Sequence, residues 1–216
     1  MIDFHRLYKD YQKGVNGHLA TNVLNAGCLL HWVMLLNPGD ILEIGAGSGK
    51  TSCLIKRLIP KARVVAADVD PEICKDIIEF SKRASVDIEV ECCDTLALPY
   101  KDSEFDICFS IGLLEHFKKE LMVKAICEQL RVAKVVMLDV PLIHWFFLPR
   151  AVDAELKWTK VQWLQALGRY SSILDFTLFG PPTEEIEMLI ILSNQVSLTL
   201  DLGMGLPILM GGQAET

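Results

Sequence analysis

The sequence predicts an α/β protein in which a seven-stranded mixed sheet lies between two layers of helices. Short apolar runs typical of buried strands alternate with segments of helical periodicity, at a spacing of roughly 25 residues. Strands separated by helices form βαβ units, so most of the sheet should be parallel and covered on both faces. The last two strands are joined by a turn too short for a parallel crossover. One strand near the edge of this three-layer sandwich should therefore be antiparallel.

The elements follow one another in a regular order after an N-terminal segment with helical spacing, which ends at a turn over 37–40. The expected strands are 41–44, 63–67, 86–92, 105–110, 134–139, 172–179 and 186–192. The expected helices are 50–58, 71–83, 120–130 and 158–167. We therefore divide the chain into a helical N-terminal lid (1–37), an α/β domain (38–193) and a C-terminal tail (194–216).

Composition narrows the classes of function and ligand. The 216 residues are 51% hydrophobic and carry a net charge of −7, which argues against binding long nucleic acid through phosphate contacts. The seven cysteines lack zinc-ligand spacing, so no metal site is expected and the thiols should be reduced. The N-terminus has no apolar signal core, and the two most apolar stretches are interrupted by Asp and Pro. We expect a cytoplasmic protein without a transmembrane segment.

A glycine-rich loop over 43–49 joins the first strand to the next helix, a position where backbone approaches a ligand closely. A phosphate-binding P-loop needs a glycine where this chain has Ile44, so that interpretation fails. A dinucleotide-binding loop needs a glycine where this chain has Lys50, which weakens that interpretation without excluding it. The third pattern, an acid followed by glycines two, four and six residues later, is matched completely.

Two further carboxylates follow the next two strands. Asp68 ends the second strand, where an acid can accept hydrogen bonds from both hydroxyls of a ribose. Its alternative role is a helix cap, which Asp70 before Pro71 fills better. Asp94 follows the third strand, where it can accept from an adenine amino group or cap a loop. Together with Glu43, these acids end three successive strands, at the edge where open α/β sheets bind ligands.

At this point the sequence resembles a known family. The segments 41–50, 65–72, 94–99 and 105–117 are similar to the motifs of class I S-adenosylmethionine-dependent methyltransferases, and most similar to the group that includes ubiquinone/menaquinone-biosynthesis enzymes. The resemblance implies a Rossmann-like fold, S-adenosylmethionine as cofactor, and methyl transfer to a small, hydrophobic acceptor by a catalytic domain over 38–193. The Asn-Pro-Pro-Tyr signature is absent, which disfavours methylation of DNA or glutamine.

The resemblance also implies roles for individual residues. At the methionine end of the cofactor it places Glu43, Gly45, Gly47, Ser110 and Ile111. At the ribose and adenine it places Asp68, Val69, Asp94 and Thr95.

Two histidines are candidates for a general base. His116 follows the fourth strand and is a candidate general base, although it can equally begin a helix. His144 follows the fifth strand and is a second candidate, with a partly buried loop histidine as the alternative. The apolar segment 142–149 leaves open a substrate pocket, a homodimer face or a membrane contact. Two other functions also stay open: an NAD-dependent oxidoreductase, and a methyltransferase-like binding protein without turnover.

Overall fold

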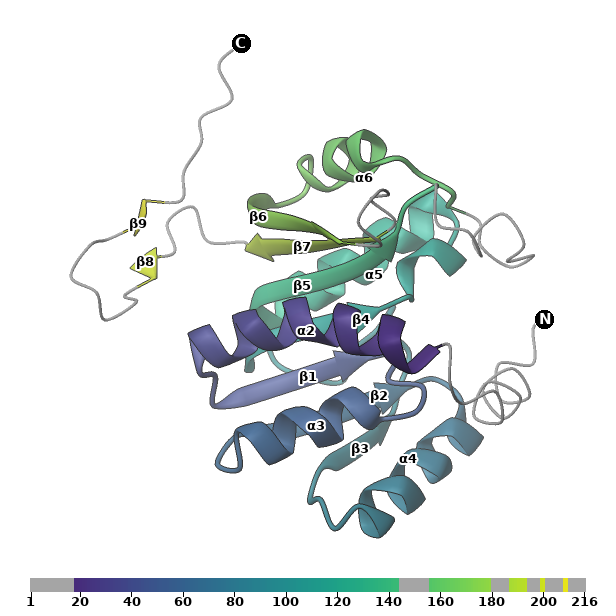
Figure 1. Ribbon diagram of the computed structural model, residues 1–216. Coiled ribbons are helices and arrows are strands. Elements are labelled where there is room, and N and C mark those ends of the chain that lie inside the picture. The colour runs from purple at the N-terminus through teal and green to yellow at the C-terminus, as the bar shows by residue number, and fades with distance from the viewer. Residues whose placement is uncertain (1–17, 144–155, 180–186, 194–198, 201–207, 210–216) are drawn as a thin grey trace.

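The computed structural model describes residues 18–143, 156–179 and 187–193, together with the dipeptides 199–200 and 208–209. Strands and helices alternate along the chain, as predicted (Figure 1). The strands of the main sheet are β1 (Asp40–Ile44), β2 (Arg63–Asp68), β3 (Glu89–Cys92), β4 (Phe105–Ile111), β5 (Ala133–Pro141), β6 (Ser172–Phe179) and β7 (Glu187–Ser193). The helices are α2 (His18–Leu36), α3 (Lys50–Leu58), α4 (Pro71–Arg83), the 3-10 turn η1 (Leu114–His116), α5 (Lys119–Val132) and α6 (Lys160–Leu167).

The main sheet has seven strands in the order β3-β2-β1-β4-β5-β7-β6. The first five of these are mutually parallel, whereas β7 is antiparallel to both of its neighbours, β5 and β6. The mixed sheet with one reversed strand near the edge is therefore confirmed. The predicted connecting turn between the last two strands lies outside the described residues.

Two strand boundaries differ from the prediction by more than one residue. The third strand begins at Glu89 rather than at 86, because the Val86 N–H bonds to the Ser81 carbonyl and so belongs to the turn that ends α4. The fifth strand runs on to Pro141, because pairing with β7 continues as far as Glu187. This second extension depends on a distant strand, which the local apolar pattern does not reveal.

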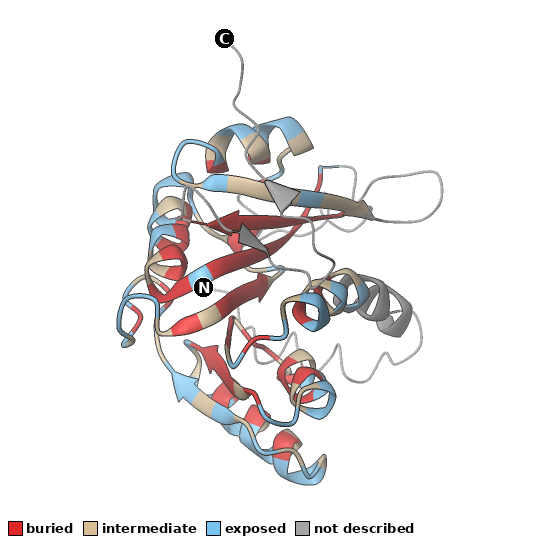
Figure 2. Ribbon diagram, turned by 90° about the vertical axis from the view of Figure 1, so that its left-hand side faces the viewer, coloured by how far each residue is buried: buried red, intermediate tan, exposed pale blue. Residues whose placement is uncertain are grey.

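Alternate residues of the central strands face two separate cores, and these strands are the most deeply buried part of the molecule (Figure 2). One face is covered by α2, α3 and α4, and the other by α5 and α6 (Figure 1). The edge strand β3 is largely exposed. This arrangement is the predicted three-layer sandwich.

The second half of α2 is one of the covering layers. Leu29 and Val33 are fully buried against the sheet, in the same cluster as Ile41 and Phe109. This part of the predicted lid segment therefore belongs to the core of the domain. Residues 1–17 lie outside the described residues, and a lid role for them stays a prediction.

The end of the chain is described only in part. Thr199–Leu200 pairs with Ile208–Leu209 in a separate two-stranded ladder. Among the described residues, no helix combines the length and the apolar character that crossing a bilayer requires.

Candidate active site

The glycine loop turns sharply between β1 and α3 at the carboxyl edge of the parallel strands. Gly45, Gly47 and Gly49 all have positive φ angles, of 66°, 53° and 65°. A side chain at Gly45 would also collide with Leu113, since a Cβ there would lie 2.9 Å from its Cδ1 atom. Glycine is needed at these positions because other residues rarely adopt this conformation. The loop therefore presents bare backbone at the edge where a ligand is expected.

Asp68 ends β2 and joins the loop after β1 to the loop after β2. Its carboxylate accepts hydrogen bonds from the Gly47 N–H (3.0 Å) and from the Asp70 N–H (3.1 Å). Burial raises its pKa, and these backbone hydrogen bonds oppose the rise. Each carboxylate oxygen has a second lone pair, so the group can still accept from two neighbouring hydroxyls of a ligand. The predicted helix cap is Asp70, whose side chain accepts from the Glu72 N–H at 2.8 Å.

Glu43 at the end of β1 points to the first turn of α3 rather than into open space. One of its carboxylate oxygens accepts hydrogen bonds from both the backbone N–H (3.1 Å) and the hydroxyl of Ser52. Burial raises the pKa of Glu43 to about 7, and the nearby Asp68 charge adds to the rise against the two Ser52 hydrogen bonds. In this structure Glu43 shapes the loop by fixing α3 against β1.

The titration of Glu43 predicts a specific pH dependence of stability. The unfolded residue ionises near pH 4.5 and the native residue near pH 7, so the native state holds the extra proton between these values. The stabilisation is complete below pH 4.5 and is lost as the pH rises through about 7. We expect wild type to lose about 2–3 kcal/mol relative to Glu43→Gln between pH 5 and pH 8. Urea unfolding of both proteins at the two pH values measures this; a difference that does not change with pH would contradict it.

The predicted adenine side contains one exposed apolar group and one buried hydroxyl. Val69 is 65% exposed directly after Asp68, so it offers an apolar surface to a ring. Asp94 accepts a hydrogen bond from the Leu96 N–H at 2.9 Å, which is its loop-capping role, and its other carboxylate oxygen bonds to none of the described residues. Thr95 is buried, and its hydroxyl oxygen has no hydrogen-bond partner among the described residues. A buried hydroxyl without a partner is costly, and an adenine nitrogen would satisfy it.

The predicted methionine side and the candidate bases lie beyond β4. Ser110 is buried at the end of β4, and Ile111 is partly buried beside it. His116 ends η1, with its Nε2 atom 3.7 Å from a carboxylate oxygen of Glu115. His144, the second candidate base, lies outside the described residues.

Sequence reasoning missed a group of acids on the far side of β4. Glu115, Asp139 and Glu187 are buried, and the charges of the two glutamates both act on Asp139. The available signal was Asp139 itself, an acid that follows four apolar residues of the fifth strand. The two glutamates come from distant segments, so only the fold brings them together. No group of three or more acid, His or Cys side chains among the described residues has the geometry of a metal site.

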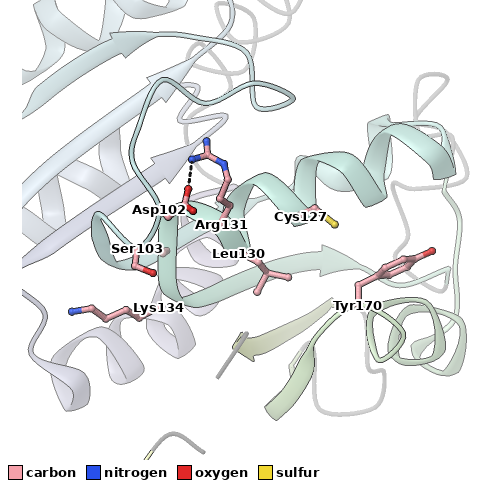
Figure 3. A pocket seen from close by; sticks show the side chains of 8 residues that line it. Asp102, Ser103, Cys127, Leu130, Arg131, Lys134 and Tyr170 are labelled. Carbon is pink, nitrogen blue, oxygen red and sulfur yellow. Dashed lines mark hydrogen bonds and ion pairs between the residues drawn. The ribbon is translucent and has the colours of Figure 1, made fainter. Parts of the chain in front are cut away.

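A cavity of about 390 Å³ lies away from this site, beside the first residues of β5 (Figure 3). Its two main cations are already ion-paired: Arg131 with Asp102 at 3.0 Å and with Glu128, and Lys134 with Asp106 at 2.7 Å. Ligands of open α/β sheets bind at the opposite, carboxyl ends of the strands. We therefore take the glycine loop, and not this cavity, as the candidate functional site.

Comparison with known proteins identifies the domain. A family model described as a methyltransferase domain matches residues 41–135. The chain contains a class I methyltransferase domain. The matched range begins in the first strand and includes the glycine loop together with Asp68 and Asp94. The cofactor of this family is S-adenosylmethionine, so the predicted cofactor is confirmed.

Curated relatives share part of this methyltransferase domain. The chain is 32% identical over 97 residues to a protein named probable tRNA methyltransferase 9B from Mus musculus, covering 44% of this chain and 20% of the relative. It is 27% identical over 113 residues to demethylmenaquinone methyltransferase from Thermus thermophilus, covering 48% of this chain and 51% of the relative. The chain thus spans from a fifth to about half of the length of these relatives.

Solved structures share the fold over a longer range. A Pyrococcus horikoshii protein superposes with a TM-score of 0.73 at 17% identity, over 90% of this chain and all of that chain. Magnesium protoporphyrin IX methyltransferase from Synechocystis, solved with bound S-adenosylmethionine, superposes with a TM-score of 0.61 at 15% identity, over 78% and 77%. At these identities the likeness shows the methyltransferase fold alone.

Proposed function

We propose that this chain transfers a methyl group from S-adenosylmethionine to a small-molecule acceptor. The observation that carries the proposal is the carboxyl edge of β1, β2 and β3. There Asp68 retains lone pairs for ribose hydroxyls, Val69 exposes an apolar surface, and the buried Thr95 hydroxyl has no described partner. These features fit the ribose and the base of a nucleoside. An NAD-dependent oxidoreductase would also use the ribose acid, but its loop requires a third glycine where this chain has Lys50.

Methyl transfer from a sulfonium requires little of the protein beyond positioning the two reactants and excluding water from the site. S-adenosylmethionine supplies an activated methyl carbon: the acceptor's lone pair forms the new bond while the carbon–sulfur bond breaks, and its electron pair stays on sulfur. An acceptor N–H or O–H must also lose a proton. His116 is our candidate for receiving it, because this side chain lies just beyond β4 and is partly exposed.

The names of the relatives point to different acceptors, a tRNA and demethylmenaquinone. The chain's charge favours a small molecule: the net charge is −7, and Glu115 of η1 and Asp139 of β5 are buried acids near the carboxyl end of β4. A phosphate backbone would be repelled there. The predicted hydrophobic character of the acceptor depends on the segment 142–149, of which only Leu142 and Ile143 are described. It stays a prediction, as does a homodimer.

Transfer of labelled methyl groups tests the proposal. The full chain is incubated with methyl-tritiated S-adenosylmethionine and, separately, with the small-molecule fraction and the tRNA fraction of a cell extract. We expect label in the small-molecule fraction and none on tRNA, with the signal lost in Asp68→Ala. Label on tRNA would contradict the acceptor class. No transfer to either fraction, with cofactor still bound, would favour a binding protein without turnover.

A further inference from the structure

Three buried carboxylates meet on the far side of β4, from three separate segments of the chain. Glu115 lies in η1, Asp139 in β5 and Glu187 at the start of β7, with exposed fractions of 5%, 3% and 5%. Asp139 pairs with Leu189, so Glu187 is its diagonal neighbour on the same face of the sheet. We call Glu115, Asp139 and Glu187 the acidic triad.

Asp139 is the member of the acidic triad with neither a hydrogen-bond donor nor a cation at its Oδ2 atom in the described part of the chain. Its Oδ2 atom is buried and has no hydrogen-bond partner, and it forms no ion pair with any lysine or arginine in the described part of the chain. Burial, followed by the charges of Glu187 and Glu115, raises its pKa well above the ordinary value. A buried carboxylate is costly unless a hydrogen-bond donor or an opposite charge faces it. We therefore expect this oxygen to have a partner that the described residues do not supply.

The triad also lies on the acceptor side of the site. Asp139 pairs with Ile111, and the Gly112 N–H donates to the Asp139 carbonyl at 3.1 Å. Neighbouring strands are about 5 Å apart. Asp139 is thus one strand beyond the residues expected to line the methionine end of the cofactor, in the direction away from the ribose acid Asp68.

We propose that the acidic triad binds a positively charged group of the acceptor, an ammonium or guanidinium. The proposal rests on the proposed function and names its substrate class. Such a cation would donate to the Asp139 oxygen that no described residue satisfies, and its charge would offset the charges of Glu187 and Glu115 that act on Asp139. A protonated amine has no lone pair, so the charged group anchors the acceptor while a different atom receives the methyl group. The triad therefore determines specificity and takes no part in the transfer.

Binding of simple cations to the S-adenosylhomocysteine-loaded protein tests this. The probes are 1,4-diaminobutane and agmatine, with 1,4-butanediol as the neutral control of matched shape, in calorimetric titrations. We expect both cations to bind and the diol not to bind. Asp139→Asn should weaken cation binding about 10- to 100-fold, and so should Glu187→Gln, which guards against a folding defect in one variant. The exposed Asp102→Asn, at the opposite edge, should change nothing.

The same titrations distinguish a failure of this proposal from a failure of the proposed function. If neither cation binds more tightly than the diol, or if Asp139→Asn binds the cations as well as wild type, the proposal is overturned. If Asp139→Asn instead weakens S-adenosylhomocysteine binding, the triad holds the ammonium of the cofactor, which also overturns it. Failure of wild type to bind S-adenosylhomocysteine would refute the proposed function itself, a result distinct from both.

Discussion

Replacing Gly49 by alanine is expected to destabilise the protein by about 2–5 kcal/mol. The residue has a φ of 65°, which costs other residues about 1–2 kcal/mol. A Cβ atom there would also lie 2.6 Å from the Cγ2 atom of Ile77, a fully buried residue of α4. Overpacking of this kind costs about 1–3 kcal/mol more. Denaturant unfolding at constant pH measures the sum.

Gly27→Ala is the matched control for this substitution. Gly27 lies in α2, is exposed, and has no atom within 4 Å of an added Cβ. Alanine there should leave stability unchanged or raise it by up to about 1 kcal/mol, since alanine is the better helix former. Equal effects of the two substitutions would show that neither the conformation nor the contact at Gly49 is as described.

Replacing Asp68 by alanine is expected to weaken binding of S-adenosylhomocysteine by about 1–3 kcal/mol, or roughly 5- to 150-fold in Kd. The substitution removes the acceptor of the ribose hydroxyls and also releases the Gly47 N–H that shapes the glycine loop. Isothermal titration calorimetry measures the change.

The control for Asp68 is Asp70→Ala. Asp70 is two residues further along and caps α4 through the Glu72 N–H. Its loss should lower stability by about 0.5–2 kcal/mol and leave the Kd nearly unchanged. An unaltered Kd in Asp68→Ala would remove Asp68 from the cofactor site.

Much of the fold and of the candidate site could be predicted from the sequence alone, because these features depend on local patterns. Apolar runs and their spacing predicted the order of strands and helices, and the short last connection predicted the reversed strand. The acids at the carboxyl ends of β1, β2 and β3 could be placed on one edge because parallel strands end together. Asp70 could be assigned as the helix cap because Pro71 follows it.

The features of the site that could not be predicted depend on contacts between segments that are distant in the sequence. Glu115 and Glu187 are 72 residues apart, and only the pairing of β5 with β7 brings the second of them beside Asp139. The direction of the Glu43 side chain, toward Ser52 of α3, likewise depends on how that helix sits against β1. The unsatisfied hydroxyl of Thr95 depends on burial, which its neighbours in sequence do not determine.

The most direct test of the central claim is a pair of calorimetric titrations of the wild-type chain, one with S-adenosylhomocysteine and one with NAD. The proposed site predicts one-to-one binding of S-adenosylhomocysteine and no comparable binding of NAD. Tight binding of NAD with no binding of S-adenosylhomocysteine would contradict the account and restore the oxidoreductase alternative.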